Sequence, residues 1–165
     1  MRISLTKGVE LAKYAESVLQ QVKSLEEQKN FYKEWDINKK FHLGIEPMLL
    51  AFSMELALKA WYIFDFNDAE VIKTHNLHKI FRALKPKSQD LLSKRFKQTV
   101  AITNPDFFYL NYDIKDILYA NKHAFTEWRY IYESKKSLHF NQSGFTATIE
   151  TVSYTHLTLP TTSRV

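Results

Sequence analysis

Four ionisable side chains at helical spacing are the first sign of chemistry in this chain. Glu55 and Lys59 lie four residues apart inside a largely apolar stretch, and Arg129 and Glu133 have the same spacing inside a second stretch. This offset puts both members of a pair on one face of a helix. Because burying an ionised group is costly unless the group is paired, we expect these four residues to form a polar cluster between two core helices.

Two interpretations of this polar cluster stay open at the level of sequence. In the first, the planar guanidinium of Arg129 reaches Glu55 across the packed helices, Glu133 shares the same guanidinium, and the cluster fixes the register of the helices. In the second, the cluster is a polar site that acts on a substrate. The residue types alone permit both.

Two histidines suggest a reaction for the second interpretation. Cleavage of RNA by its own ribose 2′-hydroxyl needs a base, a proton donor for the leaving oxygen and a cation near the phosphate. His139 follows Arg129 with nine residues between them, and His123 precedes it. Arg129, His139 and His123 are therefore the candidate catalytic residues. They could form a site within one chain or across two copies of the chain.

A second basic group lies between residues 75 and 82. His75 and His78 are three residues apart, which would let both imidazoles approach one metal ion, but no further ligands are evident nearby in the sequence. We therefore expect no metal site and no cofactor. His75, His78, Lys79 and Arg82 are instead predicted to be possible contacts for RNA.

Apolar periodicity predicts the helices that position these groups. A long amphipathic helix is expected after a Ser4 cap, and a helix that is apolar on all sides follows a connector at 31–44. The remaining helices are expected at about 74–84, with Thr74 as cap, at 88–101, at 113–134 and from a Ser143 cap through residue 151. Only three glycines occur, which disfavours turn-rich β architectures. The prediction is an all-α bundle of about four to five main helices.

Composition narrows the functional classes further. The chain contains no cysteine, which excludes disulfides, thiolate nucleophiles and cysteine-ligated zinc. The net charge of +5 permits a polyanionic partner but is smaller than expected of a dedicated nucleic-acid binder. Because no signal-like or continuous membrane-spanning apolar run is present, we expect a cytoplasmic protein that does not enter a membrane.

Residues 152–165 do not resemble the rest of the chain. Their Thr-rich sequence reads like translated sequencing-adaptor DNA, so we expect a foreign or disordered tail and a single domain that covers residues 1–151. Without this tail the net charge falls from +5 to +4, because Arg164 is its one charged residue.

Three segments, in order, resemble HEPN-like proteins. They are Glu55-Leu-Ala-Leu-Lys-Ala60, Thr74-His-Asn-Leu-His-Lys-Ile-Phe81 and Ala124-Phe-Thr-Glu-Trp-Arg-Tyr-Ile-Tyr-Glu133, and the similarity extends over roughly residues 4–151. The resemblance implies a helical bundle that is often a homodimer. It also implies a role in prokaryotic toxin, phage-defence or RNA-processing systems.

The chain departs from the family at the catalytic motif. Many active HEPN-like proteins are metal-independent endoribonucleases with an arginine followed a few residues later by a histidine, and no arginine here has a histidine at that spacing. The resemblance therefore implies an RNA-binding or ribonuclease-related protein without assigning its catalytic residues. Two alternatives stay open, a non-catalytic partner of a nucleotidyltransferase and a structural dimerisation module.

Overall fold

The computed structural model describes residues 2–31, 44–68, 70–103, 112–133, 135 and 137–158. Within these ranges every regular element is a helix, which confirms the prediction of an all-α bundle. The connector predicted at 31–44 lies mostly outside the described residues.

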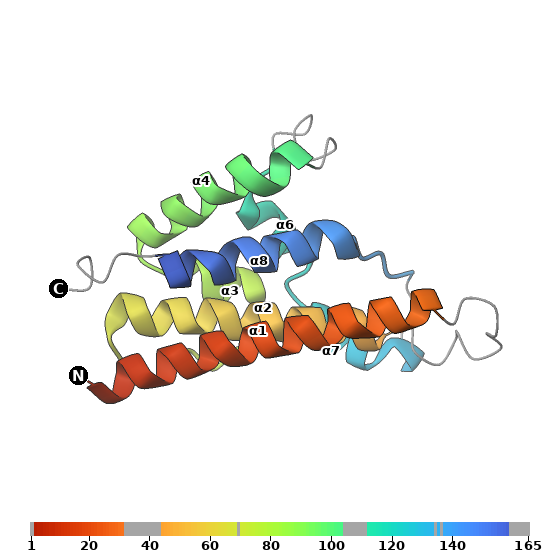
Figure 1. The fold of residues 1–165 in the computed structure, drawn as a ribbon, viewed down its shortest axis with the longest axis horizontal. Coiled ribbons are helices and arrows are strands. Elements are labelled where there is room, and N and C mark those ends of the chain that lie inside the picture. The colour runs from red at the N-terminus through yellow and green to blue at the C-terminus, as the bar shows by residue number, and fades with distance from the viewer. Residues whose placement is uncertain are drawn as a thin grey trace.

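Four long helices form the frame of the bundle (Figure 1). α1 (Arg2–Phe31) and α2 (Ile45–Phe66) run antiparallel and pack along each other, and α8 (Gln142–Thr158) packs along α2 and α1. α4 (Pro86–Thr103) packs on the outer side of α8. The shorter elements are α3 (Leu77–Arg82), α6 (Ile114–Ala120), α7 (Ala124–Arg129) and a 3-10 turn at Ile131–Glu133.

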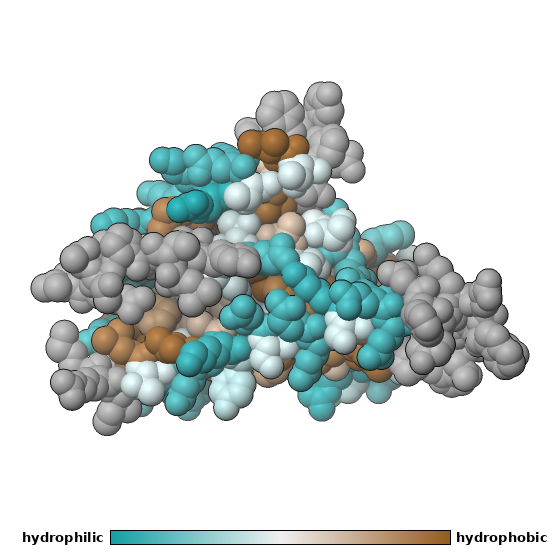
Figure 2. Space-filling view, viewed as in Figure 1, coloured by the Kyte–Doolittle hydropathy of each residue, from teal (hydrophilic) through white to brown (hydrophobic). Residues whose placement is uncertain are grey.

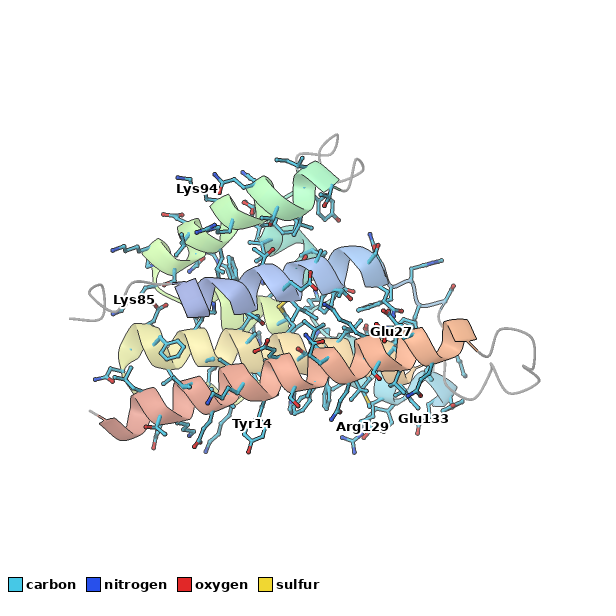
Figure 3. All side chains as sticks on the ribbon, in the orientation of Figure 1. Tyr14, Glu27, Lys85, Lys94, Arg129 and Glu133 are labelled. Carbon is cyan, nitrogen blue, oxygen red and sulfur yellow. The ribbon has the colours of Figure 1, made fainter. Side chains whose placement is uncertain are left out.

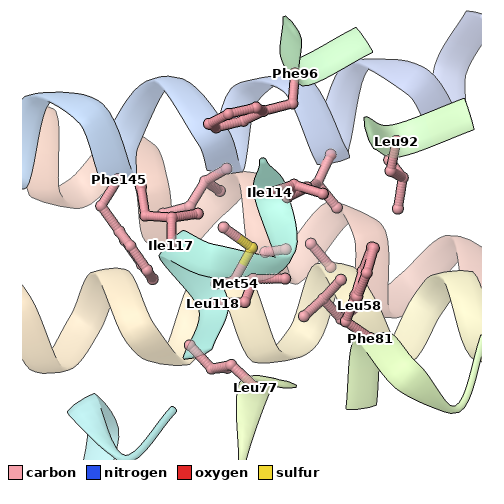
Figure 4. Packing of buried hydrophobic residues seen from close by; sticks show 14 of the residues in the cluster. Met54, Leu58, Leu77, Phe81, Leu92, Phe96, Ile114, Ile117, Leu118 and Phe145 are labelled. Atoms are coloured by element: carbon pink, nitrogen blue, oxygen red, sulfur yellow. The ribbon is translucent and has the colours of Figure 1, made fainter. Parts of the chain in front are cut away.

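α2 is the central helix because its neighbours cover most of its circumference. Met54 and Leu58 are fully buried, and side chains from α3, α4, α6 and α8 converge on them (Figure 4). Two polar groups are satisfied within this core. Ser53 Oγ donates to the Ala15 carbonyl at 2.7 Å, which ties α2 to α1, and Trp61 Nε1 donates to the Val152 carbonyl at 3.1 Å, which ties α2 to α8.

By length and composition alone, α2 is the one helix among the described residues that could cross a membrane. Most of its apolar stretch is buried inside the bundle, as in the core helix of a soluble protein. The outer surface of the neighbouring helix α1 is polar: Figure 2 shows mainly hydrophilic side chains over its exposed face. Cytoplasmic location stays a prediction.

The helix predicted at 113–134 is broken. α6 ends at Ala120 with Asn121 as its C-cap, and the Ile117 carbonyl accepts from both the Asn121 backbone amide at 3.1 Å and the Asn121 side-chain amide at 2.9 Å. A turn at 121–123 then leads into α7. The predicted single helix is therefore replaced by two short ones, and Tyr132, near its expected end, is 75% exposed.

Two predicted helix caps are displaced by asparagines. The Asn76 side chain accepts a hydrogen bond from the amide three residues later and caps α3, whereas Thr74 Oγ1 accepts from the Asn76 amide. Asn141 similarly accepts from the Gly144 amide at the start of α8, with Ser143 inside the first turn. Asparagine, serine and threonine are all favoured as caps, so composition alone does not decide between adjacent positions.

Two helices also begin earlier than predicted. α1 starts at Arg2, so that Ser4 lies within the helix, and α4 starts at Pro86. Proline fits a first helical position because its missing amide would have no partner there.

The last helix extends past the predicted domain boundary. α8 continues through Thr158, and Val152 is fully buried in the core cluster. The boundary expected after residue 151 is therefore not a structural boundary, because Val152 packs with the domain. The foreign origin of residues 152–165 stays a prediction, and residues 159–165 lie outside the described part of the chain.

Candidate functional site

A buried carboxylate on α2 organises the most polar part of the bundle. The Glu55 side chain is 3% exposed and binds two basic groups. Lys59 Nζ donates to Glu55 Oε1 at 2.6 Å, and His75 Nδ1 lies 2.9 Å from Glu55 Oε2. Both carboxylate oxygens are therefore hydrogen-bonded, which is the condition for holding an ionised group inside a protein.

Local structure explains why these three residues meet. Lys59 is one helical turn after Glu55 on α2. His75 comes from the segment that returns after α2, and this segment is held in place by the fully buried side chain of Leu77. The Leu77 amide also donates to the Lys122 carbonyl at 3.2 Å, which joins the start of α3 to the turn between α6 and α7.

The imidazole of His75 is supported on one side and open on the other. Its ring stacks on Phe125 of α7 with centroids 5.2 Å apart, and Phe125 in turn packs against Phe52 of α2. The His75 side chain nevertheless remains 60% exposed. Among the described residues no group hydrogen-bonds to its Nε2.

The Glu55–His75 contact determines which imidazole nitrogen carries the proton. An ionised carboxylate can only accept hydrogen bonds, so His75 Nδ1 must donate. In the neutral ring the lone pair then resides on Nε2, which has no hydrogen-bond partner among the described residues. This is the arrangement by which a carboxylate orients a histidine for general acid–base chemistry.

Arg129 and Glu133 lie outside this cluster. Both are exposed at the α7 edge of the molecule (Figure 3). Arg129 lies over the Tyr130 ring, with its guanidinium carbon 5.5 Å from the centroid, and in the described part of the chain it has no ion pair with Glu55 or Glu133. The expected Arg129–Glu55 pair is thus corrected: Lys59 and His75 are the partners of Glu55.

The end of α7 explains the correction for Glu133. α7 stops at Arg129, and Tyr130 as its C-cap leads into the 3-10 turn that contains Glu133. The four-residue spacing therefore does not correspond to one α-helical turn, and the two side chains do not share a helix face.

The other candidate histidines are also separate from the Glu55 cluster. His123 is exposed at the start of α7 without a side-chain cap bond, and His139 is exposed near Ser137 Oγ at 3.5 Å. Neither has a hydrogen bond or ring contact with Arg129 among the described residues. The catalytic group expected from Arg129, His139 and His123 is therefore not assembled within this chain.

A second group of side chains lies beside His75. The His78 ring meets Tyr119 at 83°, with centroids 5.2 Å apart, and Lys122 Nζ lies over the Tyr119 ring, 3.9 Å from its centroid. Partial burial lowers the pKa of His78 below the ordinary histidine value of 6.5, and the positive charges of Arg82 and Lys122 lower this pKa further. The negative charge of Asp116 acts in the opposite direction.

Of the residues expected to contact RNA, the structure thus brings His78 and Arg82 into one positive environment, while Lys79 is exposed on the same short helix. Sequence reasoning missed Tyr119, Lys122 and Phe125. Their three-residue spacing was a usable signal, but it falls across the turn that breaks the expected helix.

No group of three or more histidine or acidic residues in the described ranges could hold a metal ion. Comparison of the chain with family models, curated proteins and solved structures gave no match.

Replacing Lys59 with methionine tests whether its pairing with Glu55 stabilises the fold. Lys59→Met should lower the free energy of unfolding by about 1–3 kcal/mol, because the buried carboxylate loses one of its two hydrogen-bonding partners. Lys97→Met is the matched control, since the Lys97–Asp113 pair is 3.8 Å long and Lys97 is largely exposed. That change should cost at most about 1 kcal/mol. Urea unfolding measures both, and equal effects would contradict the account.

The positive environment of His78 predicts a titration pattern. Lys122→Ala should raise the His78 pKa, because a positive charge that opposes protonation is removed, whereas Asp116→Asn should lower it. Proton NMR titration of the imidazole signals, with His78→Gln to assign the resonance, measures both shifts. A His78 pKa that does not respond to Lys122→Ala would show that Lys122 is not near this ring in solution.

Proposed function

We propose that this protein is a HEPN-like ribonuclease that cleaves RNA through proton transfer at His75. The observation that carries the proposal is the pairing of a buried carboxylate with an exposed imidazole: Glu55 holds His75 Nδ1 at 2.9 Å, and Nε2 is left open. A histidine with one nitrogen fixed and the other accessible is suited to general acid–base catalysis.

The proposed reaction is attack by a ribose 2′-hydroxyl on the adjacent phosphate. His75 Nε2 accepts the hydroxyl proton as the O2′–P bond forms and the P–O5′ bond breaks. The leaving 5′-oxygen takes a proton from water, and His75 returns its own proton to solvent. The products are a 2′,3′-cyclic phosphate and a 5′-hydroxyl end, so that neither an oxidant nor a metal ion is needed for the atoms to balance.

Glu55 acts in this proposal as a positioning residue. It fixes the protonated nitrogen of His75 and stabilises the imidazolium that forms when Nε2 takes up a proton. The Phe125 ring limits the orientation of the imidazole from the other side. Both contacts act on His75 before substrate arrives, which is the preorganisation that acid–base catalysis requires.

Arg129 supplies the cation for the phosphate. It lies one turn after Phe125 on α7, so it emerges on the same side of that helix as the ring that His75 stacks on. Its guanidinium has no carboxylate partner among the described residues and is exposed. An exposed guanidinium binds phosphate oxygens in a bidentate manner and offsets the charge that builds up during the attack.

The wider proposal follows from the resemblance described above. We place the activity in a prokaryotic toxin or phage-defence system, with RNA as substrate, a cytoplasmic location and a homodimer as the working form. The positive net charge supports an anionic substrate of this kind.

Cleavage of labelled RNA by matched histidine variants tests the proposal. His75→Gln should slow cleavage by about 100-fold or more, because it removes the proton-transferring group. His139→Gln, which alters another exposed histidine, should leave the rate near that of the wild type. Glu55→Gln should also slow cleavage, because an amide at this position can donate to Nδ1 and favours the wrong tautomer.

The same experiment also identifies the chemical ends of the products and measures the rate in the presence of a chelator. The expected products carry 2′,3′-cyclic phosphates and form at the same rate in excess EDTA, and circular dichroism checks that each variant is folded. A wild-type protein that cleaves no RNA would refute the proposal. Cleavage that depends on His139 and ignores His75 would refute it equally.

A further inference from the structure

We propose that single-stranded RNA binds along a strip formed by His78, Arg82, Tyr119 and Lys122, with a base stacked on Tyr119. This aromatic–basic strip lies beside the Glu55–His75 pair, and the inference deepens the function proposed above by naming the form of its substrate and the surface that selects it. Binding of RNA to the strip does not depend on the proposed catalysis. Only the cleavage of the bound strand rests on the proposed function.

The strip combines a ring with mobile positive charge. Tyr119 is 55% exposed at the end of α6, and the Lys122 ammonium rests over its ring at 3.9 Å. A lysine side chain is long and flexible, so the ammonium can exchange the ring for a phosphate and leave the ring face to a base. Stacking on an aromatic side chain next to a cation is how single-stranded nucleic acids are commonly bound.

The electrostatics of the strip favour an anion. Arg82 and Lys122 both act as positive charges on the His78 ring, and Asp116 is the acidic group that opposes them. The Asp116 carboxylate accepts a hydrogen bond from the Asp113 amide at 2.9 Å in the capping box of α6, which fixes its position but leaves its charge in place. Two positive charges against one negative charge leave this surface net positive.

The strip is continuous with the proposed catalytic residue. His75 and His78 flank Leu77, whose amide binds the Lys122 carbonyl, so both histidines lie next to the turn that carries Lys122. On the facing side, Tyr119 contacts His78 and Phe125 contacts His75. A strand with one base stacked on Tyr119 and the neighbouring phosphate paired with the Lys122 ammonium therefore extends towards His75.

The exposed ring discriminates between kinds of ligand. In a duplex the faces of the bases are covered by their neighbours, whereas an unpaired base can stack on Tyr119. An acidic peptide would use the positive charges but has no planar group at regular spacing for the ring. The combination of ring and charge therefore favours unpaired RNA over both.

Binding measurements on a protein that does not cleave test this inference. In the His75→Gln background, fluorescence anisotropy with an oligouridine of about 12 nucleotides gives the dissociation constant. Tyr119→Leu should weaken binding by about 10-fold, since base stacking is lost. Lys122→Ala should weaken binding too and reduce the slope of log K against log salt by about 0.7, the value for one phosphate on a single strand.

Two variants of the same chemistry control for non-specific effects. Tyr14→Leu removes an exposed tyrosine from α1, and Lys94→Ala removes an exposed lysine from α4, and Figure 3 shows these residues on opposite outer sides of the bundle. Both should bind oligouridine like their parent. Duplex RNA of the same length should bind more weakly than the single strand and should not respond to Tyr119→Leu.

Three results would overturn the inference: unchanged binding by Tyr119→Leu, equal affinity for duplex and single strand, or displacement of the RNA by a polyglutamate peptide at similar concentration. The cleavage assay keeps this outcome separate from that of the proposed activity. If the strip variants weaken binding while the wild type cleaves no RNA, the strip stands and the catalytic proposal fails. If cleavage requires His75 while Tyr119→Leu leaves RNA binding unchanged, the catalytic proposal stands and the strip fails.

Discussion

The carboxylate of Glu55, placed almost out of contact with water on the central helix, is the constraint on which the site depends. An ionised group at that depth is tolerated only if both of its oxygens are bound. Lys59 satisfies one oxygen from the same helix, but the second must be satisfied by another part of the chain, and His75 does this. The burial of Glu55 therefore requires the segment that leads into α3 to place His75 beside it.

The arrangement of α7 follows from the same contact. Phe125 packs on both the His75 ring and Phe52, so α7 covers the place where the two earlier elements meet. At the other end of α7 the Trp128 carbonyl approaches Gly44 so closely that a Cβ atom there would lie 2.7 Å from it. Because glycine allows this approach, the short helix is held at both ends, and its exposed face keeps a fixed relation to His75.

Much of the fold could be predicted from apolar spacing, because the long helices bury continuous stripes and α2 is apolar on nearly every side. The pairing of Glu55 with Lys59 was also accessible, since a four-residue offset within one helix fixes proximity. The partner of Glu55 on another element was not. Arginine and histidine can both bind a carboxylate, and the sequence does not show that a turn at 121–123 separates α6 from α7 and that α7 ends at Arg129. A single asparagine within the otherwise regular apolar periodicity of 113–134 is not enough to predict such a break. The surface beside the site was missed because it depends on contacts between elements: Tyr119 meets His78 and Phe125 meets His75 only where α6 and α7 pack against the segment at 75–78.

Glu55 fixes the proton of His75 on Nδ1 and leaves Nε2 unprotonated in the neutral ring. The most direct measurement is NMR spectroscopy of the ring nitrogens of His75 in isotope-labelled protein at a pH where the imidazole is neutral. The wild-type ring should be protonated on Nδ1 and unprotonated on Nε2, and this preference should be lost or reversed in Glu55→Gln. A His75 ring protonated on Nε2 in the wild-type protein, and unaffected by the substitution, would contradict it.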